Sequence, residues 1–135
     1  MDILIDDVLV NILNFLNTKE LFRFCICNKN NFDFLKRNIE QFKFYCRSSK
    51  ITDKGLEYLN GVHTISLSYC NQRTDRGLEY FKGVHTISLY DCNQITDKGL
   101  EYLKSVHIID LIHCNQITDK GLECLKNVHT IYIWG

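Results

Sequence analysis

Cysteine, histidine and aspartate recur in this 135-residue chain at a constant interval of 22 residues. These residue types ligate metals, transfer protons and act as nucleophiles in proteins. They form a cysteine column, a histidine column and an aspartate column, whose members are Cys70, Cys92 and Cys114; His63, His85, His107 and His129; and Asp53, Asp75, Asp97 and Asp119. Because the spacing is constant, one repeated structural unit must position all three columns.

The copies of this unit begin at residues 51, 73, 95 and 117. The first copy reads ITDKGLEYLNGVHTISLSYCNQ, and no insertion or deletion separates the copies. A fixed period of this length is typical of a solenoid, in which each coil buries its apolar side chains only against neighbouring coils.

Each coil is expected to hold one short strand and one short helix. In the first copy, alternating apolar residues predict a strand near residues 64–68. A helix is predicted over residues 54–59, with Asp53 as its N-cap and Gly61 after its last turn. Successive strands would form a parallel sheet with a spacing of about 4.8 Å, and the helices would line the opposite side. The predicted fold class is therefore α/β, a solenoid of a short parallel sheet plus short helices.

The repeat resembles the leucine-rich repeat, in its cysteine-containing subclass. The family pattern L-x-x-L-x-L-x-x-C-x-x-[IL]-T-D-x-G-L-x-x-L falls on Val62, Ile65, Leu67, Cys70, Arg73, Thr74, Asp75, Gly77, Leu78 and Phe81. Arg73 departs from the pattern, because the other copies have isoleucine there. We expect a weak spot at this residue, where either its stem turns outward to solvent or the turn is distorted. The segment FKFYC at residues 42–46 is a candidate for an additional, irregular strand.

The stacking of successive coils places the members of each column in one line, and this decides how we interpret the three columns. Thiols in one line give no tetrahedral metal cage, and they can instead donate to turn carbonyls, so the cysteine column is expected to serve packing. The histidine column leaves open a metal-binding ladder and, as the interpretation we favour, a half-exposed residue copied with the repeat. In both cases stacked imidazolium rings repel, which predicts lowered pKa values and a loss of stability below about pH 6. The aspartates are interpreted as helix caps. We predict no cofactor and no metal site.

The N-terminal segment has apolar residues at helical spacing and predicts three short helices, over residues 6–16, over residues 18–24 and near residues 32–39, with a turn at NKNN before the third. The segment LIDDVLVNILNFLNTKELFRFCICNKN resembles an F-box, and the matching positions are Leu4, Asp7, Val8, Leu9, Ile12, Leu13, Phe15, Leu16, Glu20, Leu21, Phe24, Cys27, Asn28 and Lys29. Ile5 stands where the family has proline, and Asn31–Phe32 where it has tryptophan.

The predicted domains are therefore an F-box-like three-helix domain at residues 1–41 and a leucine-rich-repeat solenoid at residues 42–135. The other interpretation of the first segment is a helical cap that covers the apolar end of the first coil.

Charge and composition exclude several classes of function. Lys plus Arg and Asp plus Glu both number 16, so no net field gathers nucleic acid or an anionic membrane. The longest apolar runs are far shorter than the roughly 20 residues of a membrane span. The start MDILIDDVLV has acids where a secretory signal has bases, and an odd number of cysteines, 7, fits a reducing compartment. We therefore expect an intracellular, cytoplasmic protein.

The copies differ mainly in and just after the strand, at positions that face away from the core on the concave face. The exposed helix-side glutamates did not diverge, which favours tuning for a partner over drift. Aromatic and apolar side chains at such positions are typical of protein interfaces. The predicted target-binding residues are Ser66, Ser68, Ser88, Tyr90, Asp110, Ile112, His113, Tyr132 and Trp134.

The fourth copy stops on its strand, which places Ile131 and Ile133 at an open sheet edge. We expect this edge to be covered by a partner, by self-association of the chain or by the indole of Trp134.

An enzyme is not expected, because glycine-rich phosphate loops, nucleophile motifs and paired carboxylates beyond the repeat are missing from the sequence. An F-box followed by leucine-rich repeats resembles the substrate receptors of Skp–cullin–F-box ubiquitin-protein ligases. That resemblance implies that the F-box binds a Skp-type linker protein, and through it the cullin ligase, while the repeats hold a target protein. The implied linker contacts are Ile5, Val8, Leu9, Ile12, Leu13, Leu16 and Leu21.

Compact chains of this kind are also similar to proteins of large DNA viruses, which implies use of a host ligase in the host cytoplasm. The alternative function is a stand-alone leucine-rich-repeat scaffold for protein–protein interaction, with a helical N-cap and no role in ubiquitin transfer.

Overall fold

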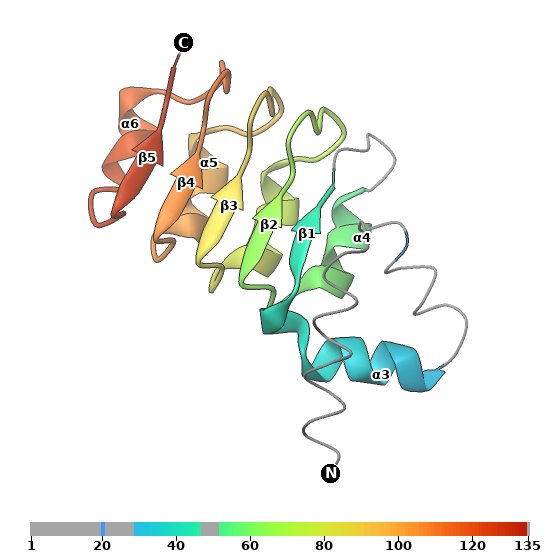
Figure 1. The fold of residues 1–135 in the computed structure, drawn as a ribbon. Helices are drawn as coiled ribbons and strands as arrows, with labels where there is room; N and C mark the ends of the chain where they lie inside the picture. Colours follow the sequence, from blue (N-terminus) through green and yellow to red (C-terminus); the bar gives the residue numbers. More distant parts are fainter. Residues whose placement is uncertain (1–19, 21–28, 47–51, 135) are drawn as a thin grey trace.

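The computed structural model describes residue 20, residues 29–46 and residues 52–134. Its framework is a five-stranded parallel sheet with the strand order β1–β2–β3–β4–β5. The strands are β1 (Lys43–Tyr45), β2 (Thr64–Ser66), β3 (Thr86–Ser88), β4 (Ile108–Asp110) and β5 (Thr130–Tyr132). Figure 1 shows the strands side by side in chain order, with the short helices of the repeats behind them.

The strands of the repeats pair in a constant register. Ile65 pairs with Ile87 and Ile87 with Ile109, and the same shift of one repeat continues to β5. Equivalent residues of successive copies therefore lie side by side, and each sequence column becomes a physical row along the sheet. The predicted parallel ladder of a leucine-rich-repeat solenoid is confirmed, and so is the additional strand at FKFYC, since β1 pairs with β2.

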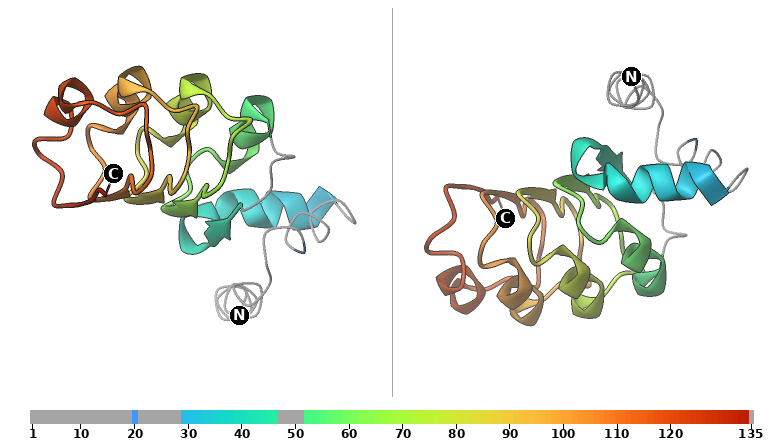
Figure 2. Two further views of the ribbon diagram at one scale, coloured as in Figure 1. Left: turned by 90° about the horizontal axis from the view of Figure 1, so that it is seen from above. Right: turned by 90° about the horizontal axis from the view of Figure 1, so that it is seen from below.

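Short helical segments form a row on the side of the solenoid opposite the sheet (Figure 2). They are α4 (Asp53–Leu56), η2 (Glu57–Leu59), η3 (Asp75–Phe81), α5 (Asp97–Leu100), η4 (Glu101–Leu103) and α6 (Asp119–Glu123). The helix predicted over residues 54–59 begins one residue earlier, and its second half is a 3₁₀-helix. In the second copy the whole segment is a 3₁₀-helix. Segments of one or two turns often tighten in this way, because few of their backbone groups can form α-helical bonds.

The helix α3 (Lys29–Arg37) and the short η1 (Ile39–Gln41) precede β1. They confirm the third predicted helix, but α3 begins inside the NKNN segment, where the sequence predicts a turn. Asparagine is a weak helix breaker, and the apolar face of Phe34 and Leu35 packs into the core of the first coil, which outweighs that preference. The helices predicted over residues 6–16 and 18–24 lie, apart from Glu20, outside the described residues.

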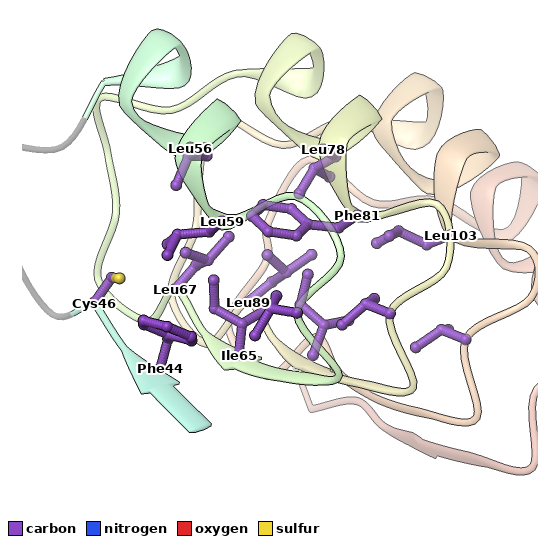
Figure 3. Packing of buried hydrophobic residues seen from close by; sticks show 14 of the residues in the cluster. Phe44, Cys46, Leu56, Leu59, Ile65, Leu67, Leu78, Phe81, Leu89 and Leu103 are labelled. Carbon is purple, nitrogen blue, oxygen red and sulfur yellow. The ribbon is translucent and has the colours of Figure 1, made fainter. Parts of the chain in front are cut away.

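The hydrophobic core fills the space between the row of helices and the sheet (Figure 3). In the first coil Leu56, Leu59 and Ile65 are buried, and the equivalent residues of the next coils continue the same cluster. Complete burial of such a side chain stabilises the folded chain by about 1.5–3 kcal/mol. The neighbouring coils provide that burial. Leu122, which belongs to the last coil, is accordingly buried only in part. The coils are therefore stable together rather than singly.

The cysteine column lies inside the solenoid and bonds to the preceding coil. The Sγ atom of Cys70 lies 3.1 Å from the carbonyl oxygen of Cys46, and Cys92 Sγ lies 3.1 Å from that of Leu67. Cys114 repeats this contact, and burial raises the pKa of its thiol to about 11. The expected packing role is confirmed: these thiols donate weak hydrogen bonds to backbone carbonyls of the preceding coil.

The aspartate column braces neighbouring coils, so the prediction of N-caps is wrong. Asp75 Oδ1 accepts the backbone N–H of Thr96 at 2.8 Å, and its Oδ2 accepts the Thr96 hydroxyl at 2.6 Å. Asp53 and Asp97 hold the next coil in the same way. Each aspartate is the first residue of its own helical segment, and the preceding threonine stands at the N-cap. The sequence reasoning failed because capping is a local preference, whereas this bond crosses 21 residues.

Arg73 is buried, so the expectation that its side chain turns outward is wrong. Its Nη1 atom contacts the sulfur of Cys70 and lies 3.4 Å from the carbonyl oxygen of Leu67 and 3.5 Å from that of Cys46. The aliphatic stem fills the place that Ile95 occupies in the next copy. The guanidinium lies within reach of these two carbonyl oxygens. A charged group at this depth carries a desolvation cost that isoleucine avoids.

The last described strand leaves apolar side chains exposed. Trp134 is 73% exposed and Ile133 is 45% exposed. The expectation that the Trp134 indole covers this edge is therefore wrong, because a covering ring would bury much of its own surface.

Candidate protein-interaction surface

The exposed side of the sheet carries three rows of side chains, which we call the outer face. The first row lies on the strands themselves and consists of Tyr45, Ser66, Ser88, Asp110 and Tyr132. The second row follows each strand by two residues and contains Tyr90, Ile112 and Trp134. The third row follows by three residues and consists of Tyr69, Asp91 and His113. The sheet register therefore gathers onto one face the positions at which the repeats differ most.

Ser68 belongs to the second row by sequence, but it is buried. Its hydroxyl oxygen lies 2.9 Å from that of Ser66 and 3.2 Å from that of Ser88. The prediction that Ser68 contacts a target is not supported by this position, since the side chain is withdrawn under its neighbours. A serine is short enough to bond sideways within the sheet, whereas the larger residues of this row must project outward.

A chain of hydrogen bonds runs along the outer face from this serine to Asp110. The hydroxyl of Ser88 donates to Asp110 Oδ2 at 2.9 Å. The other oxygen, Oδ1, accepts the backbone N–H of Ile112 at 3.0 Å. These bonds hold the carboxylate in one orientation and leave part of its acceptor capacity unused, because an ionised carboxylate has about four acceptor sites.

Three rings on the second and third rows form one cluster. The ring centroids of Tyr69 and Tyr90 lie 5.2 Å apart, and those of Tyr90 and His113 lie 5.3 Å apart in an edge-to-face arrangement. The third-row residues have a left-handed backbone, with φ values of 60° at Tyr69 and 61° at His113. This sharp turn after each strand brings the third row beside the second, at a conformational cost that non-glycine residues bear at few sites.

The electrostatic surroundings of Tyr90 are acidic. Partial burial, the neighbouring Tyr69 and the carboxylates of Asp91 and Asp110 raise the pKa of Tyr90. The Asp91 carboxylate also accepts a hydrogen bond of 2.8 Å from the Asn93 side chain. The cluster therefore combines aromatic surface with two carboxylates.

The histidine column forms a stack directly before the strands, at their N-terminal ends. The ring centroids of His63, His85, His107 and His129 are separated by 4.6, 4.6 and 4.5 Å. Burial first, and then the neighbouring His63 and His107, lower the pKa of His85. Within the described part of the chain, no group of three or more His, Cys, Asp or Glu side chains is arranged to hold a metal ion. The rings face one another, so their nitrogens do not converge on a point.

The structure brings most of the predicted target-binding residues together on the outer face, with Ser68 as the exception. The predicted target-binding set omits three members of this surface, Tyr45, Tyr69 and Asp91. The alternation in FKFYC was a signal for Tyr45, which is 57% exposed. Tyr69 and Asp91 occupy the same repeat column as His113, which the sequence predicted as a target contact. The predicted linker contacts lie outside the described residues; they are Ile5, Val8, Leu9, Ile12, Leu13, Leu16 and Leu21.

Comparison with protein families agrees with this architecture. Residues 1–39 match the F-box domain, and residues 91–104 and 102–126 match the leucine-rich repeat. A search of curated proteins found no significant match. Proteins of these families are typically non-enzymatic adaptors or scaffolds that bind other proteins. Across the described residues, no helix is both long enough and apolar enough to cross a lipid bilayer.

Proposed function

We propose that this chain, which combines an F-box domain with leucine-rich repeats, is the substrate-recognition adaptor of a Skp–cullin–F-box ubiquitin ligase. In this role the N-terminal domain binds a Skp-type linker protein, and the repeats hold the protein to be ubiquitinated. The observation that carries the proposal is the pairing of the two modules in one chain. An F-box alone would bind the linker but no target protein. Repeats alone would bind a target but would not connect it to the ligase.

The proposed linker contacts are apolar residues of the F-box match, named above. Apolar side chains at helical spacing suit the burial of one helix face against a partner. Some of these residues must also hold the bundle together, so only part of the set reaches the linker. We propose the division between the two modules at residues 41 and 42, with repeats starting at residues 51, 73, 95 and 117, and we place the protein in the cytoplasm, where such ligases act.

The outer face is the proposed target site. It is the part of the solenoid where the copies differ and where aromatic side chains lie exposed, as Tyr69 and Tyr132 do at 51% each. Tyrosine and tryptophan contribute disproportionately to the free energy of protein association, because they bury a large area at a small entropic cost. In contrast, the glutamates on the helix side, Glu57, Glu79, Glu101 and Glu123, are the same in each copy.

The alternative function is a stand-alone interaction scaffold with no ubiquitin role. A specific observation favours a further contact in that case: Ile133 is exposed beside the last strand, and an unpaired strand edge invites pairing with a second chain. Self-association through β5 would appear as a dimer in light scattering and would not require the F-box.

A pull-down with a purified Skp-type linker protein tests the proposal. Wild-type chain is expected to bind, and the double variant Leu9→Asp plus Leu13→Asp is expected to lose binding, because two charges would be buried at the contact. Circular dichroism must show that the solenoid of the double variant still melts cooperatively. As a matched control, Tyr132→Ser on the outer face should keep linker binding. Folded wild-type chain that does not bind the linker supports the scaffold instead.

A further inference from the structure

The outer face differs in charge from the rest of the solenoid. The segments that build it in the four repeats, residues 64–70, 86–92, 108–114 and 130–134, contain Asp91 and Asp110 but no lysine or arginine. The cationic residues of the repeats belong to the helical segments and the turns beside them, apart from Arg73, which is buried. Within the four repeats, the formal charge of the outer face is therefore negative, and the exposed Lys43 of the same face lies on β1, at the end of the sheet.

Both carboxylates lie near the aromatic cluster. Asp91 follows Tyr90 directly in the chain, and Asp110 pairs with Ser88, which stands two residues before Tyr90 on the neighbouring strand. Tyr90 also stands in the middle of the cluster, with Tyr69 on one side and His113 on the other. A cation that approaches Tyr90 therefore meets a ring face and a carboxylate together, and both attract it.

The carboxylate of Asp110 is fixed before any partner arrives. Ser88 and the backbone N–H of Ile112 each hold one of its oxygens, at 2.9 and 3.0 Å. Fixed groups lose little conformational entropy when a partner binds, which increases the affinity obtained from each contact. The geometry thus provides a rigid anion at the edge of an aromatic surface.

We infer that the outer face binds an extended, arginine-containing segment of the target, with an arginine side chain held between the ring of Tyr90 and the carboxylate of Asp110. The inference rests on the proposed role of the repeats as the target-binding part. Arginine fits better than lysine, because its planar guanidinium stacks on aromatic rings and donates two parallel hydrogen bonds to a carboxylate. Acidic proteins and nucleic acids are disfavoured by the same charges.

The dimensions of the face set the length of the segment. Five strands at about 4.8 Å span roughly 19 Å, which corresponds to about six residues of an extended peptide at about 3.3 Å per residue. The serine hydroxyls of the first row and Tyr132 flank the central site, so a peptide of this length meets polar groups on one side of its arginine and aromatic surface on the other.

Selection from a library of random peptides of twelve residues tests the inference on the full chain. We expect the enriched peptides to contain arginine, and the affinity of a synthesised hit, measured by calorimetry, to fall when its arginine is replaced by lysine and to fall further with glutamine. Enrichment of acidic or purely apolar peptides, or no enrichment of arginine, would overturn the inference.

Two variants locate the site. Asp110→Asn removes the charge but retains an acceptor for Ile112 and a donor for Ser88, so the fold is preserved, and we expect at least a tenfold loss of affinity for the hit. The matched control, Asp119→Asn, removes the same charge from the helix side and should leave the affinity unchanged. Equal effects of the two variants would show a non-specific attraction and overturn the inference. Tyr90→Leu should also weaken binding at least fivefold; an unchanged affinity would contradict the ring contact.

Linker binding separates this inference from the proposed ligase role. If the chain binds the linker but selects no arginine-containing peptide, the inference fails and the adaptor role stands. If it selects such peptides but binds no linker, the adaptor role fails and the face remains a peptide-binding site.

Discussion

The carboxylate of Asp97 holds Thr118 of the next coil by both of its oxygens. Oδ1 accepts the Thr118 backbone N–H at 2.8 Å, and Oδ2 accepts the Thr118 hydroxyl at 2.6 Å. The same pair of bonds joins each earlier coil to its successor. A polar row thus runs along the helix side of the solenoid, parallel to the apolar core, and it fixes the position at which each helical segment begins.

Replacing Asp97 with alanine should destabilise the solenoid. Charge-assisted hydrogen bonds contribute about 1.5–3 kcal/mol when buried, and this partly exposed pair should contribute about 1 kcal/mol. Asp119→Ala is the matched control, because among the described residues the pair of bonds to a threonine of the next coil is made by Asp53, Asp75 and Asp97. Chemical denaturation measures both variants; equal midpoints for the two would contradict the bracing role.

The Thr118 bonds also predict how stability depends on acid. They lower the pKa of Asp97 in the folded chain. The unfolded chain then takes up the proton first as the pH falls, so this contribution is complete above about pH 4 and is lost as the pH falls through the folded pKa. Asp97→Ala should therefore show a smaller loss of stability between pH 5 and pH 3 than the wild type.

Gly99 packs against this row, and alanine there should be destabilising. An added Cβ atom would lie 2.5 Å from Asp75 Oδ1 and 3.0 Å from Leu78 Cδ1. Asp75 cannot swing away without breaking its two bonds to Thr96, so we expect a loss of about 1–2 kcal/mol despite the better helix propensity of alanine. Gly83→Ala is the control, since no atom lies within 4 Å of its added Cβ. A denaturation midpoint of Gly99→Ala equal to that of the control would contradict the close contact.

Arg73→Ile should stabilise the chain, by about 1–2 kcal/mol, because it removes a buried charge and restores the residue of the other copies. The carbonyl oxygens that Arg73 contacts would keep partners: Cys70 Sγ lies near that of Cys46, and Cys92 Sγ near that of Leu67. Thermal unfolding measures the change. A lower melting temperature for the variant would mean that the contacts of the guanidinium stabilise the fold by more than its desolvation costs, and it would contradict the prediction.

The histidine stack should make the solenoid less stable in mild acid. The folded pKa of His85 is lowered, chiefly by burial and then by His63 and His107. The unfolded residue takes up a proton near its ordinary pKa of about 6.5, so stability falls as the pH drops below that value and approaches the folded pKa. His85→Gln should reduce this dependence. A wild-type melting temperature that is flat between pH 7.5 and pH 5.5 would contradict the prediction.

Much of the fold could be predicted because a repeat turns sequence columns into rows in space. Once Ile65, Ile87 and Ile109 share one column, parallel pairing in register follows with little further information. The burial of Cys92 and the histidine stacking at the strand spacing follow in the same way.

Contacts between coils were harder to predict, because they depend on side-chain reach rather than on local preference. Asp75 looked like a helix cap, yet its partner lies in the next coil. Arg73 looked too polar for the core, yet backbone carbonyls receive its guanidinium. On the outer face, the burial of Ser68 and the left-handed turn at Tyr69 depend on geometry that the order of residue types does not encode.

The central claim is that this chain bridges a ligase linker and an arginine-containing target. Size-exclusion chromatography with light scattering, on the full chain mixed with a Skp-type linker and a labelled arginine-containing peptide, tests it directly. The claim predicts one species that contains all three components in equal amounts, and it predicts that Asp110→Asn releases the peptide while the linker stays bound. Elution of the linker apart from the folded chain, or displacement of the peptide by the linker, would contradict it.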